Sequence, residues 1–472
     1  MTTKGPTPID YFDTAMMLVA QNRLIEAGAY FEKAILLKPS YAEAWGNRGN
    51  VLHALGNHFD AILNYNQAIA HNANMAEFWN NRGATWVDLR CIEKGLSDYA
   101  QALKLNPKLV ESHNNRGNAL KLLGRIKEAR AEYCKALQIN PDYVDGRLNK
   151  SIMDLEHGDF VEGFKDYESR WRSGQLQPRG FPCPNWEGED LNGKRLLLWA
   201  EQGLGDAVQF VRFASQIKKL YPYTKIAVEV RGTLAKLCST VPGVDEVVEY
   251  GENPREADYA CAMLSAPRIL KTTMESIPAP QRYMWPSPYR IQVWRDRIKT
   301  DLANLGAKML IGICWSGQSR PLQPVANSID ARRSTALAQW QPLALPGVVF
   351  VSLQTGAGLA QVKTPPVGMT IADFSDNFDD FADTAALMEC LDLIISVDTA
   401  VPHVAAACGR PVWMLSRFDG CWRWHGDRKD SPWYPTLRQF RQKNYGDWNG
   451  LFEEVSVELK KLLEPSVALA AE

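Results

Sequence analysis

The stretch AEAWGNRGNVLHALGNHFDAILNYNQAIA at residues 42–70 decides the fold of the first third of the chain. Within it, small and aromatic residues follow the pattern Ala-x3-Tyr-x2-Ala, at Ala61, Tyr65 and Ala68. The pattern recurs with a period of 34 residues, at Ala27/Phe31/Ala34, Gly95/Tyr99/Ala102 and Ala129/Tyr133/Ala136. A fixed period of this length predicts a stack of helix-turn-helix units whose small residues let paired helices pack closely.

Two further series keep the same phase. Glycines recur on the first helix of each unit at Gly49, Gly83 and Gly117, and the units end at Pro39, Ala73, Pro107 and Pro141. This combination resembles the tetratricopeptide repeat. It implies repeats that begin near residues 8, 42, 76 and 110, with a degenerate fifth near 144, in an α-solenoid domain spanning residues 8–172.

Asparagines occupy the sixth position of successive repeats, at Asn47, Asn81, Asn115 and Asn149. They resemble the ladder in the superhelix of the O-linked N-acetylglucosamine transferases, which grips the backbone of extended protein substrates. An amide both donates and accepts, so it can pair with a peptide unit of any sequence. The series is therefore predicted to bind a protein acceptor in a concave groove; the alternative is a tolerated polar residue on a solvated face. The neighbouring Arg48, Arg82 and Arg116 are expected to serve solubility or contacts between repeats.

The remaining residues alternate between apolar runs and helical patterns. Residues 173–192 are rich in Pro and Gly and predict a linker. A first domain, residues 193–290, begins with an apolar run at 195–200, a glycine turn and a helical pattern at 208–220, and continues with a strand at 225–230.

A second domain, residues 306–463, follows a charged connection. Its predicted strands lie at 310–315, 348–353, 393–397 and 411–415. The fold class is therefore α followed by α/β, with two Rossmann-like domains in series. An active site is expected in the cleft between the carboxyl ends of their strands.

Composition excludes several classes of protein. Lys and Arg number 53 against 54 Asp and Glu, and neither residues 1–172 (21 against 21) nor 173–472 (32 against 33) carry the positive excess that nucleic-acid binding needs. No apolar run approaches the length of a membrane span. The nine cysteines are scattered without a C-x-x-C pair and predict reduced thiols with no zinc site. Without a recognisable leader, the protein is expected in the cytoplasm.

The turn Gly203-x-Gly205-Asp206 follows the first strand of the first domain. It is not the dinucleotide fingerprint, because Val208 stands where the third glycine belongs. Asp206 is either a general base at the carboxyl end of the strand or the cap of the following helix, and position alone favours the cap.

The second turn is Asp398-Thr399-x3-His403, after the strand at 393–397. Pro402 suits a first helical turn, and Gly409 suits its end. Free backbone N–H groups, a hydroxyl and an imidazole therefore converge where a phosphate would bind. The alternative is a histidine packed in a helix.

Softer candidates lie nearby. Arg332 and Arg333, with Ser316 and Gly317 at the end of the strand at 310–315, are candidate contacts to a diphosphate, or else form a solvated loop.

Two clusters carry weaker signals. The aromatic residues at 422–425 and 433–434 offer faces for a base or sugar, although core packing is the commoner role. Asp376–Asp383 is read as a solvated loop, and no Asp-x-Asp stands in the predicted cleft, so no metal is expected.

The two turns together resemble the heptosyltransferase-like branch of the GT-B glycosyltransferases, which pairs a G-x-G-D turn with a D-[TS]-x3-H turn. The resemblance covers about residues 193–460 and implies that Asp206 is the catalytic base. Ala400 stands where lipopolysaccharide heptosyltransferases have glycine, which argues against a heptose donor. The whole arrangement resembles bacterial tetratricopeptide-repeat glycosyltransferases, some of which modify flagellin with pseudaminic or related nonulosonic acids.

The sequence therefore predicts an inverting, metal-independent glycosyltransferase without a cofactor. It would move a sugar from a nucleotide-sugar donor to Ser or Thr of a protein, with a CMP-nonulosonic acid favoured over UDP-, GDP- or ADP-sugars and flagellin as one expected acceptor. The alternatives are transfer to a glycan or lipid-linked saccharide, and a non-catalytic scaffold. Donor, acceptor and oligomeric state are not identified.

Overall fold

The computed structural model describes residues 5–174, 176–251, 256–318, 324–426 and 428–464. Residues 1–4, which belong to the segment expected to lack a leader, and residue 175 of the expected linker lie outside these ranges. The chain divides into two compact units. The first comprises Met1–Met153 with Asp166–Gln175, and the second comprises Asp154–Lys165 with Leu176–Glu472.

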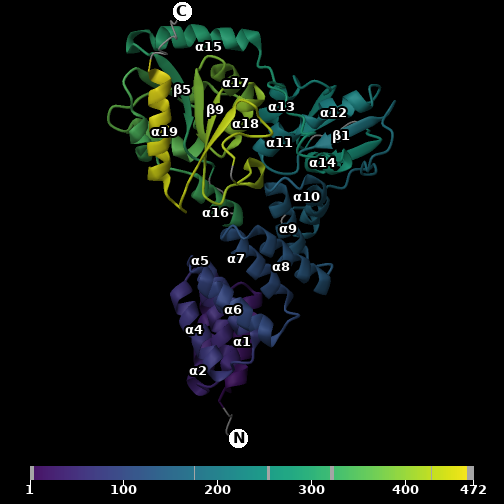
Figure 1. Cartoon of the computed structure of the whole chain (residues 1–472), viewed down its shortest axis with the longest axis vertical. Helices are drawn as coiled ribbons and strands as arrows, with labels where there is room; N and C mark the ends of the chain where they lie inside the picture. Colours follow the sequence, from purple (N-terminus) through teal and green to yellow (C-terminus); the bar gives the residue numbers. More distant parts are fainter. Residues whose placement is uncertain (1–4, 175, 252–255, 319–323, 427, 465–472) are drawn as a thin grey trace, which may run out of the picture. The chain divides into compact units, whose positions relative to one another are not determined.

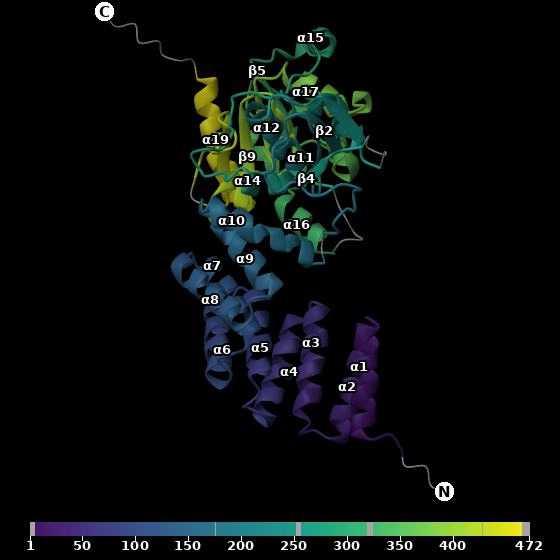
Figure 2. The same cartoon turned by 90° about the vertical axis from the view of Figure 1, so that its right-hand side faces the viewer.

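The first unit is a solenoid of paired helices, as predicted (Figure 2). The pairs are α1 (Pro8–Ala20) with α2 (Leu24–Leu37), α3 (Ala42–Ala54) with α4 (His58–His71), α5 (Ala76–Asp88) with α6 (Ile92–Leu105), and α7 (Val110–Leu122) with α8 (Ile126–Ile139). Helix α9 (Val144–Glu156) begins the degenerate fifth repeat. A short 3₁₀ turn, η1, covers Glu168–Arg172.

The recurring glycines are required by the recurring tyrosines. A Cβ atom at Gly49 would lie 2.6 Å from the ring of Tyr65, and one at Gly117 would lie 2.6 Å from the ring of Tyr133. The tyrosine of each second helix therefore rests directly on the backbone of the first helix. The 34-residue pattern is this one contact repeated.

The arginines that follow the ladder positions bind partners on the second helix of their own repeat. Arg82 makes a two-pronged ion pair with Asp98, at 2.8 and 2.7 Å, and Arg116 lies 3.7 Å from Glu132. Arg48 donates to Asn64 and reaches Glu32 of the preceding repeat at 3.3 Å. The expectation of repeat contacts is confirmed, and most of these contacts lie within a repeat.

The second unit begins with the helix α10 (Phe160–Tyr167), most of which packs there. Phe160 stacks on Trp433 with ring centroids 5.7 Å apart, and Phe164 meets the edge of Trp422 at 5.7 Å. The sequence assigns this segment to the fifth repeat, but its aromatic side chains belong to the α/β core.

Two parallel sheets form the rest of the second unit. The first has the order β3-β2-β1-β4 and the second the order β7-β6-β5-β8-β9-β10. Their bounds are β1 (Arg195–Trp199), β2 (Lys225–Val230), β3 (Glu246–Glu249), β4 (Tyr259–Ala262), β5 (Met309–Cys314), β6 (Val348–Ser352), β7 (Thr370–Asp373), β8 (Leu393–Val397), β9 (Val412–Ser416) and β10 (Leu437–Arg441). Helices cover the faces of both sheets (Figure 1), which is why the central strands are continuous apolar runs.

The helices of the second unit differ in part from the prediction. The pattern at 208–220 is broken after Phe210 into two short helices. The helices are α11 (Leu204–Phe210), α12 (Phe213–Leu220), α13 (Gly232–Cys238), α14 (Ala266–Ile269), α15 (Pro288–Asp301), α16 (Pro324–Arg333), α17 (Phe381–Met388), α18 (Ala400–Ala407) and α19 (Trp448–Leu463). Short 3₁₀ turns cover Met263–Ser265, Ala303–Leu305, Leu337–Leu343, Gly356–Lys363, Ser375–Asn377 and Trp422–Trp424.

The order of the strands places the candidate site. In each sheet the chain winds outward from a central strand in both directions, so the connections leave in opposite directions between β1 and β4 and between β5 and β8. Ligands of open α/β sheets bind at the carboxyl ends of the strands at such switch points. The two turns singled out in the sequence follow β1 and β8, at these points.

No helix among the described residues is long and apolar enough to span a membrane. The nine cysteines, all of them within the described ranges, form no disulfide.

Candidate functional site

The two turns meet although they lie far apart in the sequence. Helix α11, which carries Gly205, packs against α18, which carries His403 (Figure 1). A Cβ atom at Gly205 would lie 2.7 Å from Cδ2 and 3.0 Å from Nε2 of His403. Since side-chain carbons do not approach so closely, only glycine admits the imidazole at this position.

Asp206 has two partners. Its Oδ2 accepts a hydrogen bond from the N–H of Gly203 at 2.8 Å, which closes the first turn of α11. Its Oδ1 lies 2.5 Å from Nη2 of Arg423, and 19% of the Asp206 side chain is exposed. The carboxylate therefore caps its helix and forms an ion pair with a residue of the second sheet region.

Arg423 is a functional candidate that sequence reasoning missed. Its guanidinium lies 4.4 Å from the ring centre of Trp422 and 5.7 Å from that of Phe210, and the side chain is 8% exposed. Stacking on aromatic faces holds the cation beside Asp206. The aromatic residues of this segment drew attention away from the arginine between them.

His403 is a buried and neutral group. Its Nδ1 lies 2.9 Å from the hydroxyl of Tyr434, and its ring centre lies 4.9 Å from that of Trp424. Burial first, and then the charges of Arg423, Arg212 and Arg333, lower the pKa of His403 well below its ordinary value of 6.5. At neutral pH the imidazole offers hydrogen bonds to a phosphate but no positive charge.

A second buried arginine, Arg212, supports this histidine. It is 1% exposed and donates hydrogen bonds to the carbonyls of Pro278 and Trp433 and to the hydroxyl of Tyr283. Its guanidinium lies 4.5 Å from the ring centres of both Tyr283 and Tyr434. Because Tyr434 also contacts His403, Arg212 holds the imidazole in place through that ring.

Thr399 and Asp398 lie where β8 ends. The Thr399 hydroxyl accepts a hydrogen bond from the N–H of Val401 at 3.3 Å and so caps α18. Asp398 is half-buried, and its carboxylate forms no hydrogen bond or ion pair with any described residue. Free N–H groups in this first helical turn remain able to bind an anion.

The loop after the neighbouring strand β5 is held by Gln354, another residue that the sequence did not reveal. The Gln354 side-chain oxygen accepts hydrogen bonds from the N–H groups of Trp315 and Ser316, at 3.1 and 2.9 Å. Its amide donates to the Ser316 carbonyl at 3.1 Å. Ser316 is thereby fixed at the switch point between β5 and β8.

Arg332 and Arg333 already have acidic partners. Arg332 pairs with Asp419, and Arg333 pairs with Asp330. Arg333 lies beside Gly317, where a Cβ atom would come within 3.1 Å of its Nε. These cations are held near the switch point, but a phosphate would have to share them with carboxylates.

The aromatic clusters form core. Trp422, Trp424, Trp433 and Tyr434 are between 0% and 4% exposed, so their faces are covered by protein and not open to a base or sugar.

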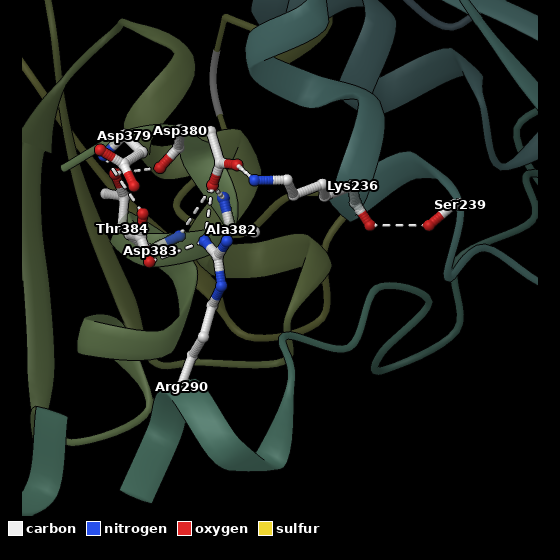
Figure 3. Close-up of polar contacts among 8 residues, drawn as sticks. All are labelled: Lys236, Ser239, Arg290, Asp379, Asp380, Ala382, Asp383 and Thr384. Carbon is white, nitrogen blue, oxygen red and sulfur yellow. Dashed lines mark hydrogen bonds and ion pairs between the residues drawn. The ribbon is translucent and has the colours of Figure 1, made fainter. Parts of the chain in front are cut away.

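The acidic cluster at 376–383 is only partly a solvated loop (Figure 3). Asp380 accepts hydrogen bonds from the N–H groups of Ala382 and Asp383, which caps α17, and its carboxylate pairs with Lys236 at 2.8 Å and Arg290 at 2.9 Å. Burial disfavours the Asp380 carboxylate, but these partners outweigh it and lower the pKa of Asp380. The predicted solvated loop is wrong for Asp380 and Asp383, because both are ion-paired at the start of a helix.

The ladder asparagines bind one another across repeats. The side-chain amides donate from Asn81 to Asn50 at 2.9 Å, from Asn115 to Asn80 at 3.2 Å and from Asn149 to Asn114 at 2.9 Å, whereas Asn47 donates to the Glu43 carbonyl. Each amide has a second N–H beyond the one used here. The ladder is therefore part of the repeat stack and retains donors.

Comparison with known families supports both parts of the chain. Tetratricopeptide repeat models match residues 12–77 and 110–143, and the model of glycosyltransferase family 9 (heptosyltransferase) matches residues 380–415. Repeats and a family 9 segment occur in one chain. The family 9 match begins at Asp380 and contains the turn of Asp398, Thr399 and His403.

Among curated proteins, the chain is 30% identical to Protein FlbA of Caulobacter vibrioides over 334 residues, which covers 66% of this chain and 54% of that protein. The chain thus spans about half the length of the curated relative it matches. Two solved structures are similar to about a third of the chain. YrrB, described as a TPR protein with an unusual peptide-binding site, is 21% identical, and the match covers 35% of this chain and 85% of that one with a TM-score of 0.29. A thermophilic TPR protein of Thermus thermophilus is 22% identical, with 36% and 93% covered and a TM-score of 0.33.

Proposed function

We propose that the chain is an inverting glycosyltransferase that moves a sugar from a nucleotide-sugar donor to a Ser or Thr hydroxyl of a protein, without a metal ion. The observation that carries the proposal is the meeting of the Gly203–Asp206 turn with the Asp398–His403 turn, each at the switch point of its own parallel sheet. This arrangement provides a carboxylate on one side of a cleft and a helix N-terminus on the other. The family 9 match over 380–415 supports the same assignment.

The donor side is the end of β8. The N–H groups of the first turn of α18 and the Thr399 hydroxyl would stabilise the nucleotide phosphate as it leaves the sugar. Ser316 and Gly317 approach from β5, and Arg332 and Arg333 add positive charge near them. His403 is neutral, so its contribution would be a hydrogen bond or the position of Gly205.

Asp206 is proposed to take the proton of the acceptor hydroxyl as that oxygen attacks the anomeric carbon and the nucleotide phosphate departs. Both carboxylate oxygens already have a partner, but each keeps a further lone pair for the hydroxyl. Arg423 weakens the base and orients it. Proton transfer is therefore expected late, when the attacking oxygen has become acidic.

Arg423 gives the proposed site a second use for a paired cation. A donor diphosphate that reaches the cleft would attract this guanidinium, since Arg binds phosphates in two-pronged fashion. Sharing Arg423 with the donor would free Asp206 to act as base only when the donor is bound.

The acceptor is proposed to lie along the ladder of the first unit. Each repeat offers an amide donor that is sequence-tolerant, which suits an extended protein segment. Flagellin and a CMP-activated nonulosonic acid are the acceptor and donor that the resemblance to flagellin-modifying enzymes suggests.

A thermal-shift panel of CMP-, UDP-, GDP- and ADP-sugars tests the activity class. A ligand at 100 times its Kd should stabilise the chain by about 2.7 kcal/mol. Stabilisation by CMP-nonulosonic acids is expected. Stabilisation by UDP-sugars alone would overturn the donor preference, and no stabilisation by any nucleotide sugar would favour a non-catalytic scaffold.

A further inference from the structure

Two histidines and an aspartate converge on the edge of the repeat unit, away from any residue used above. His53 lies in the last turn of α3, His58 begins α4, and Asp88 ends α5. One ligand atom of each lies within 4.8 Å of the other two, and Nε2 of His53 is 2.7 Å from Oδ2 of Asp88. The three residues come from three helices of two neighbouring repeats.

The backbone between the two histidines is held by a compact turn. The N–H of Asn57 donates to the Leu52 carbonyl at 2.8 Å, and the N–H of Gly56 donates to the His53 carbonyl at 2.9 Å. Gly56 has a φ of 81°, the left-handed conformation that this helix ending requires. The turn returns the chain so that the ring centres of His53 and His58 lie 5.2 Å apart.

One of these rings has an unsatisfied atom. Nδ1 of His58 is buried and has no hydrogen-bond partner, a situation that normally costs free energy and that a ligand would relieve. The second and third ligands are already aligned, because Asp88 orients the ring of His53 through their hydrogen bond.

We infer that His53, His58 and Asp88 form a binding site for a divalent transition metal ion, with Zn²⁺ as the best fit. Imidazole nitrogens with one carboxylate are ligands that Zn²⁺ accepts, with the fourth position left for water, whereas Mg²⁺ and Ca²⁺ prefer oxygen alone. Tetrahedral bonds of about 2.0 Å separate ligand atoms by roughly 3.3 Å. The separations here, from 2.7 Å to within 4.8 Å, need only side-chain adjustment to reach that value. A bound ion would join the second repeat to the third.

Calorimetric titration of the full chain with Zn²⁺, after treatment with a chelator, tests the site. One Zn²⁺ per chain is expected for the unaltered protein, with affinity at least tenfold weaker in His53→Ala and His58→Ala. His71→Ala is the matched control, because His71 is an exposed histidine at the other end of α4, and it should bind as the unaltered protein does.

A second readout protects the inference against a variant that fails to fold. Asp88→Asn is a conservative surface change that removes the charged ligand, and it should also weaken Zn²⁺ binding while circular dichroism stays unchanged. Equal binding in all four variants would mean an adventitious ion only, and no binding by the unaltered chain would likewise overturn the inference.

Discussion

Gly205 leaves the space that the ring of His403 fills, and the join between the two sheet regions depends on that space. A methyl group there would lie 2.7 Å from the imidazole. The ring is boxed in by Tyr434 and Trp424, so it cannot swing aside without disturbing the buried network around Arg212.

Gly205→Ala is therefore expected to destabilise the chain by about 1–3 kcal/mol, the usual cost of overpacking. The loss should shrink when His403 is also shortened to Ala, because the clash then disappears. Urea unfolding measures both. Gly180→Ala is the control, since no atom lies within 4 Å of the added carbon. A Gly205→Ala chain as stable as this control would contradict the packing.

The neutral state of His403 makes stability depend on pH. The unfolded chain binds this proton near pH 6.5, whereas the folded chain binds it only at lower pH. Below 6.5 the unfolded state therefore holds more protons, and the free energy of unfolding falls by up to about 1.4 kcal/mol per pH unit until the folded pKa is reached. The pKa of His425 is lowered in the same direction, first by burial, so His403 accounts for part of the loss.

Thermal unfolding midpoints at pH 7.5, 6.5 and 5.5 measure this effect. His403→Gln should lose less stability over this range than the unaltered chain, because glutamine does not titrate. His71→Gln, at an exposed site, should follow the unaltered chain. An identical pH profile for His403→Gln would show that the imidazole is not held neutral.

At the scale of elements, the predicted strands and repeats are those with strong patterns. The six strands expected from apolar runs are present, and the repeats follow from one tyrosine-on-glycine contact that recurs at a fixed spacing. The strands β3, β4, β7 and β10 were missed, because they are short or only partly apolar and pair at or beside the sheet edges. Their place is decided by neighbouring strands and not by their own sequence.

The ladder is an element-scale feature with two separable roles. Asn81→Ala removes a groove amide and also the hydrogen bond to Asn50. Asn50→Ala breaks the same hydrogen bond and leaves the Asn81 amide in place. If the ladder holds an acceptor, Asn81→Ala combined with Asn115→Ala should raise the KM for a protein acceptor several-fold, with donor affinity unchanged.

Steady-state kinetics with varied acceptor separates these roles, with Asn50→Ala as the matched variant. That variant should lose a similar amount of stability, about 1 kcal/mol, but keep its KM. A rise in KM of equal size in both variants would mean that the asparagines act only by joining repeats.

At the scale of the molecule, the sequence reveals the two turns but not what surrounds them. Motifs place Asp206 and His403 at strand ends, which the parallel topology then brings to the switch points. Arg423, Arg212 and Gln354 carry no motif, because their positions depend on contacts between segments distant in sequence. The cluster of His53, His58 and Asp88 escaped notice for the same reason, since only the stacking of repeats joins it.

The central claim is that Asp206 acts as the base in a cleft between the two sheet regions. Asp206→Asn tests it most directly, because the amide oxygen still accepts the hydrogen bond of Gly203 while the negative charge is lost. Asp296→Asn, the same change on the exposed face of α15, is the control. Sugar attached to the acceptor protein is measured by intact mass spectrometry, alongside thermal shift with the nucleotide sugar. The account predicts transfer reduced by roughly 10²–10⁴ with the thermal shift retained; transfer at the unaltered rate would contradict it.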